Sequence, residues 1–116
     1  MSSARQKGIS QISIHDVLES HLTQLLDIIT VPDKLANDLL SADLIPSAIK
    51  TRVLTTPYFD QYQKASILVN EVINSLKAFN DPKILVKFCD VLKIQDDPNL
   101  IRMANTMLKQ LGKYCV

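Results

Sequence analysis

The chain has 116 residues, the length of one domain, of which 47% are hydrophobic and 22% are charged. This composition excludes a disordered chain, because its apolar side chains are numerous enough to offset the entropy lost on folding. The net charge is +1, from 13 basic and 12 acidic residues. The sequence therefore lacks the basic excess expected of a protein that binds nucleic acid or an anionic membrane surface.

Proline positions divide the chain into helical segments. Residues 1–12 are polar and are expected to form a flexible lead to a single domain over residues 13–114. Five prolines then mark boundaries, because proline is tolerated in the first turn of a helix and disfavoured inside one. They are Pro32, Pro46, Pro57, Pro82 and Pro98. Asp81 and Asp97 each precede a proline and are predicted to be helix N-caps.

The six segments all show helical spacing of their apolar residues. In chain order, the apolar positions lie within 17–29, 35–40, 49–53, 65–76, 84–92 and 100–111. We expect the first segment to be one helix and Gly112 to cap the last. No alternating apolar and polar run is long enough to predict a strand. Short connections favour antiparallel neighbours, so the sequence predicts an all-α, six-helix antiparallel bundle.

Several runs resemble a caspase-recruitment domain of the death-fold superfamily. The second and third helices of that family are similar to the run from Leu35 to Leu54, LANDLLSADLIPSAIKTRVL. QYQKASILVNEVINSLKAF, from Gln61 to Phe79, is similar to the fourth helix, and ILVKFCDVLK and LIRMANTMLKQL are similar to the closing pair. The resemblance covers residues 14–112 and implies the Greek-key topology of the death fold. Death and death-effector domains are close relatives.

The resemblance also implies association with other caspase-recruitment or death-fold domains, including further copies of this chain. Family pairings set a basic patch on the first and fourth helices against an acidic patch on the second and third. This sequence departs from that pattern, because its first segment carries Asp16, Glu19 and Asp27 while its third carries Lys50 and Arg52. The charge pattern therefore does not identify the partner.

Charged and aromatic residues are the candidate interface. Asp33, Asp38 and Asp43 lie on or beside the second segment, Lys50 and Arg52 lie on the third, and Lys64 and Lys77 lie on the fourth. In the family that this chain resembles, opposite patches of this kind join head to tail, and such a contact forms a filament when it does not close into a ring. The alternative interpretation is that these charges are solvated helix faces. Tyr58 and Tyr62 complete the candidate surface, because aromatic residues are enriched at interfaces, whereas Phe59 is expected to pack inward.

Catalytic and metal-binding patterns are missing from the sequence. His15 and Glu19 lie four residues apart beside Asp16 and could hold a divalent ion only weakly. A defined metal site needs three or four ligands, and the sequence offers no further cluster of ligands, so no metal or other cofactor is expected. Cys89 lies in an apolar run and is interpreted as a buried, inert thiol. With no phosphate-binding loop, nucleophile elbow or paired catalytic carboxylates, we expect no enzymatic activity.

Location and function follow from these observations. Residues 1–10 contain no apolar signal core, and Cys89 and Cys115 do not resemble a secreted disulfide framework. The expected location is the cytoplasm, with no membrane association. The leading hypothesis is an interaction module that recruits or clusters signalling partners in apoptosis or innate immunity. The alternative hypothesis is a helical bundle that binds a small apolar ligand in a loosely filled core.

Overall fold

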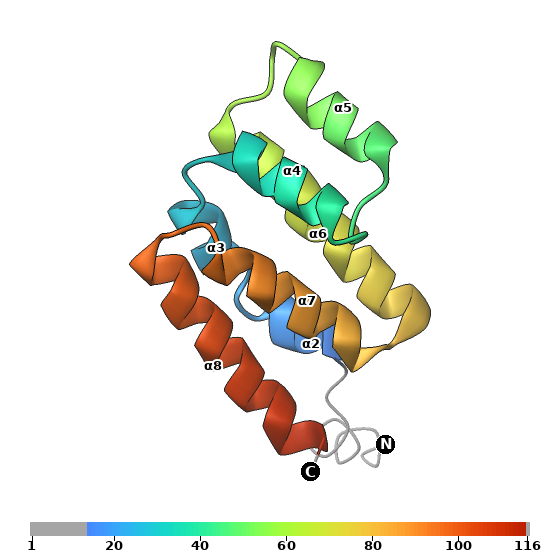
Figure 1. Cartoon of the computed structure of the whole chain (residues 1–116), viewed down its shortest axis with the longest axis vertical. Coiled ribbons are helices and arrows are strands. Elements are labelled where there is room, and N and C mark those ends of the chain that lie inside the picture. Colours follow the sequence, from blue (N-terminus) through green and yellow to red (C-terminus); the bar gives the residue numbers. More distant parts are fainter. Residues whose placement is uncertain (1–13, 116) are drawn as a thin grey trace, which may run out of the picture.

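The computed structural model describes residues 14–115, and it describes side chains over 14–112. Within that range every regular element is a helix, which confirms the prediction of an all-α bundle (Figure 1). The helices are α2 (Ile14–Glu19), α3 (Leu22–Ile28), α4 (Pro32–Ser41), α5 (Ser47–Thr55), α6 (Gln61–Phe79), α7 (Pro82–Lys93) and α8 (Pro98–Cys115). The expected flexible lead, residues 1–12, lies outside the described residues. The Greek-key topology stays a prediction.

Aspartate side chains begin three of the helices. The Asp81 carboxylate accepts a 2.9 Å hydrogen bond from the backbone N–H of Lys83, and Asp97 accepts one of 2.9 Å from Asn99. Both caps agree with the prediction made from the proline that follows each aspartate. Asp60 forms a capping box with Gln63, in which each side chain bonds the backbone N–H of the other, at 2.8 and 3.1 Å.

The prediction of a single first helix is wrong, because the chain turns between α2 and α3. The backbone N–H of His21 bonds the Leu18 carbonyl at 3.1 Å, which tightens the last turn of α2. The Ser20 hydroxyl donates to the Val17 carbonyl at 2.9 Å. His21 Nε2 then lies 3.1 Å from Gln110 Oε1 of α8, a contact that holds the turn from outside the segment.

The prediction that Gly112 caps the last helix is also wrong, because α8 continues to Cys115. The left-handed backbone positions that end helices belong to polar residues instead. Asn80 has φ 48° directly after α6, and Asp43 and Asp96 have φ 63° shortly after α4 and α7. Asn and Asp tolerate this conformation better than other side-chain-bearing residues, so these helices end without glycine.

Helix α6 is the centre of the bundle and packs against α2, α3, α4, α5 and α7. It contributes six buried side chains, those of Ala65, Leu68, Val69, Val72, Ile73 and Leu76. Helix α8 pairs with α7 and covers α2 and α3. No polar or charged side chain within 14–112 is buried, so the core of this part of the chain is entirely apolar.

Helix α5 lies at the edge of the bundle, at the top of Figure 1. It packs chiefly against α4 and α6 and contributes only Val53 to the core. Most other side chains of α5 are exposed, as are those of Pro57 and Tyr58 in its connection to α6. Among the helices that the structure describes, none has the length and apolar character that a membrane crossing requires.

Candidate interaction surface

An aromatic corner, which we define as Arg52, Tyr58, Phe59 and Tyr62, lies where α5 passes into α6. The Arg52 guanidinium carbon lies 5.7 Å from the centroid of the Phe59 ring, within the range of a cation–π contact. Phe59 is half-buried, which partly satisfies the expectation that it packs inward. Tyr58 is 89% exposed and Tyr62 is 50% exposed. The corner therefore presents two tyrosine rings and an oriented guanidinium to solvent.

A hollow of about 310 Å³ opens beside this corner, between the end of α5 and the start of α6. It is lined by Arg52, Phe59, Tyr62, Gln63, Ser66 and Ile67. No carboxylate of the described chain pairs with Arg52 or with Lys50, the other basic residue of α5. The positive charge of α5 is thus available to a group outside the chain.

Asp33 and Lys64 pair with each other inside the chain. The sequence pattern instead assigns them to opposite patches that join different molecules. In the structure Lys64 Nζ lies 3.1 Å from Asp33 Oδ1, and this bond links the first turn of α4 to the first turn of α6. The Lys64 side chain is only 19% exposed. Their charges largely neutralise each other, so this pair is a weaker candidate for intermolecular contact than the corner.

Asp38 belongs to a bonded cluster that joins α4 to the end of α7. Its carboxylate accepts hydrogen bonds from Lys34 Nζ at 3.0 Å and from Gln95 Nε2 at 2.7 Å. Lys34 also donates to the carbonyl of Ile94 at 3.3 Å. Partial desolvation raises the pKa of Asp38, but the bonds from Lys34 and Gln95 and the Lys34 charge outweigh it and hold that pKa below its ordinary value.

Asp43 and Lys77, the remaining predicted charges, lie on separate parts of the bundle. Asp43 is exposed just after α4, where its φ of 63° projects it from the turn before the buried Leu44. Lys77, in the last turn of α6, lies 3.9 Å from Glu19 of α2. The structure therefore places the predicted interface residues in several groups rather than in two opposed patches.

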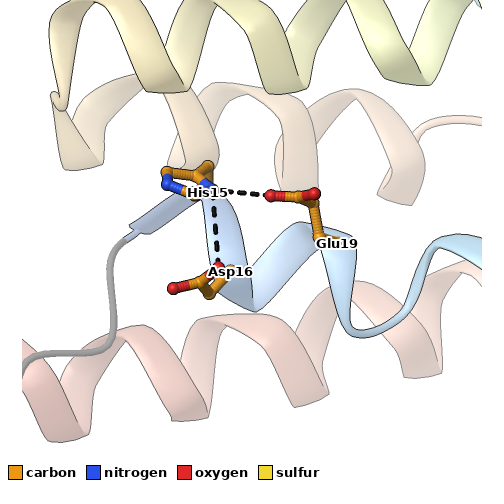
Figure 2. A group of neighbouring side chains, drawn as sticks. All are labelled: His15, Asp16 and Glu19. Atoms are coloured by element: carbon orange, nitrogen blue, oxygen red, sulfur yellow. Dashed lines mark hydrogen bonds and ion pairs between the residues drawn. The ribbon is translucent and has the colours of Figure 1, made fainter. Parts of the chain in front are cut away.

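His15, Asp16 and Glu19 form a small cluster on α2 (Figure 2). His15 Nδ1 lies 2.6 Å from Glu19 Oε1 and 3.5 Å from Asp16 Oδ1. One donor atom from each residue could face a cation, since these atoms all lie within 4.8 Å of one another. However, the Lys77 ammonium beside Glu19 already supplies positive charge there and would repel a metal ion. We interpret the cluster as a surface ion-pair group.

Sequence reasoning missed two exposed apolar residues at helix ends. Ile94, at the end of α7, is 59% exposed and lies in the same hollow as Asp43. Phe79, the last residue of α6, is 72% exposed. Both end an apolar stripe, so helical spacing alone gave no reason to place them outside the core. Apolar spacing predicts burial less well for a residue in the last turn of a helix than for a residue in the middle.

A scan of the chain against protein-family models gave no match, and searches of curated proteins and of solved structures gave none either. The resemblance to caspase-recruitment domains rests on the sequence pattern alone. What the chain does is therefore inferred from the chemistry of its surface.

Four hollows of the described surface bear on the ligand-binding alternative. Their volumes are about 440, 400, 310 and 40 Å³. Of the core residues, only Val91, Ile29 and Leu100 line any of them. The three larger hollows are therefore grooves between helices at the surface, and the smallest has about the room of one water molecule. This packing gives no support to a small apolar ligand inside the core.

Cys89 is fully buried on α7, as predicted from its apolar surroundings. Burial raises the pKa of its thiol to about 12, while the Lys93 charge opposes this increase and the Asp90 charge adds to it. The thiolate is the reactive form of cysteine, so Cys89 in the folded chain is protonated and inaccessible at neutral pH. It is not a candidate nucleophile.

The buried thiol predicts a specific pH dependence of stability. As pH rises above about 9, the unfolded chain loses the Cys89 proton while the native chain keeps it until about 12. Because the unfolded state then binds fewer protons, the free energy of unfolding falls with rising pH in this window. We expect wild type to lose stability relative to Cys89→Ala between about pH 8 and 10 in urea titrations. A constant difference between the two chains would contradict this assignment.

Proposed function

We propose that this chain is a non-catalytic interaction module that associates with other helical domains of its own kind. The observation that carries the proposal is the aromatic corner. Tyrosine and arginine are enriched among interface hot spots, and here both are displayed at an edge of the bundle that no other described helix covers. Exposed aromatic side chains with unpaired charge beside them are typical of a surface that a partner covers.

Contacts within the corner support the same proposal. Arg52 is oriented by the Phe59 ring, and the Asp60–Gln63 capping box holds the start of α6 beside it. A preorganised surface loses less conformational entropy on binding, so more of the contact energy appears as affinity. The family resemblance adds the expected setting, which is cytoplasmic recruitment or clustering of signalling partners, with any catalysis performed by a partner that proximity activates.

The test is light scattering and negative-stain microscopy on the purified chain over rising concentration at two salt levels. We expect particles that grow with concentration and shrink at high salt, because the exposed charges are screened. If the chain stays monomeric, pull-down with isolated death-fold domains is the second measurement. A chain that neither self-associates nor binds any such domain would refute the proposed function.

A further inference from the structure

The α4–α7 groove is a second open surface, separate from the aromatic corner. We define it as Ser41, Ala42, Asp43, Lys87, Asp90, Val91 and Ile94, which line a hollow of about 440 Å³. Its floor is apolar, because Val91 belongs to the core and Ile94 extends beside it with 59% of its surface exposed. An opening of this size is large enough to receive an aromatic side chain.

The rim of this groove is mainly acidic. Asp43 and Asp90 are both exposed, and neither has an ion-pair partner among the side chains that the structure describes. Lys87 is the one basic residue of the lining.

At the aromatic corner the available charge is positive, since Arg52 has no carboxylate partner among the described residues, whereas the carboxylate of the neighbouring Asp60 accepts the backbone N–H of Gln63 as the N-cap of α6. The two surfaces are therefore complementary in charge. They are also complementary in shape, because the Tyr58 ring projects from the aromatic corner and Val91 and Ile94 form the apolar floor of the groove.

We propose that the aromatic corner of one chain docks in the α4–α7 groove of a second copy. Tyr58 enters the groove over Val91 and Ile94, and Arg52 pairs with Asp43 or Asp90 on its rim. The inference rests on the proposed function and names both the partner and the two surfaces. It differs from the association expected from the sequence, in which the patches that contain Asp33 and Lys64 join different chains, because those two residues already pair within one chain.

Like surfaces cannot pair with each other in the same way. Contact of two corners brings Arg52 against Arg52, and contact of two grooves brings the unpaired carboxylates together, so both are disfavoured by repulsion. The corner and the groove share no residue, and one molecule can use both at once. Such a heterologous contact generates a ring or an open helical polymer rather than a closed dimer.

Charge exchange tests the pairing directly. Arg52→Glu and Asp90→Arg each place like charges in the contact, and each is expected to raise the concentration needed for assembly about tenfold. Mixed one to one, the two variants are expected to assemble as wild type does. In the mixture the two introduced charges are opposite and meet each other in one contact, while the unchanged Arg52 and Asp90 meet in the next. Lys109→Glu and Asp27→Arg, which change exposed residues outside both surfaces, are the matched controls.

A second pair of variants tests the geometry. Tyr58→Ala removes the projecting ring, and Ile94→Arg obstructs the groove, so each chain alone is expected to be monomeric. Their mixture retains one working contact and should stop at a heterodimer of two 13.0 kDa chains. Circular dichroism and thermal melting verify that every variant is folded, as expected from the exposure of these residues.

The outcomes separate this inference from the proposed function. Restored assembly in the charge-exchange mixture, together with a heterodimer limit in the second mixture, supports the docking. Wild-type assembly that is unaffected by Arg52→Glu and Tyr58→Ala overturns the docking and leaves the proposed function in place. A wild-type chain that stays monomeric also overturns the docking, and the proposed function then depends on binding to other death-fold domains.

Discussion

Replacing Phe88 with alanine is expected to lower the free energy of unfolding by about 3–5 kcal/mol. Phe88 is a fully buried side chain of α7 and the largest of those in the core. The substitution removes its apolar surface from the core and leaves a cavity that neighbouring helices fill only in part. A domain of this size is stable by about 5–15 kcal/mol, so the substitution should remove a large part of the free energy of unfolding.

Phe79→Ala is the matched control, because the same ring is removed from the exposed end of α6. Its effect is expected to stay within about 0.5 kcal/mol. Urea denaturation followed by circular dichroism at equal protein concentration measures both, and Phe88→Leu, which keeps most of the apolar volume, should fall between them. Equal losses for Phe79→Ala and Phe88→Ala would mean that the core is not centred where the structure places it.

Asp38→Lys is expected to lower the free energy of unfolding by about 1–3 kcal/mol. From the sequence alone, Asp38 is a surface charge whose reversal should weaken assembly without unfolding the domain. In the structure its carboxylate accepts from both Lys34 and Gln95, and its side chain is 25% exposed. A lysine there leaves Gln95 without that acceptor and sets two ammonium groups one helical turn apart. Weakened assembly of this variant would therefore not identify an interface.

The control for Asp38→Lys is Asp27→Lys, which makes the same charge change at an exposed position of α3. It is expected to leave the urea midpoint nearly unchanged.

The pH dependence of stability gives a second check on the Asp38 cluster. Because the pKa of Asp38 is lowered on folding, its contribution is present at neutral pH and is lost as pH falls below about 4, through the folded-state value. Asp38→Asn should flatten that part of the acid titration, and an unchanged titration would argue against the Asp38 cluster.

The sequence by itself determined where several helices begin and which of their faces are buried. Proline and aspartate positions predicted the starts of α7 and α8, because both residues act through the backbone of the next few positions. Apolar spacing predicted which faces of α6 and α7 are buried, since each helix can bury only the side that carries its large aliphatic residues. Burial of Cys89 and its raised pKa followed from the same pattern.

Tertiary structure alone decided which residues act together. The turn between α2 and α3 contains neither proline nor glycine, and its His21 is held by Gln110, a residue 89 positions away. Asp33 meets Lys64 and Asp38 meets Gln95 only because α4 packs beside α6 and α7. The α4–α7 groove likewise combines two distant segments. Sequence spacing places residues on a face of one helix, whereas the partner of that face depends on how the helices cross, and that is set by packing of the whole core.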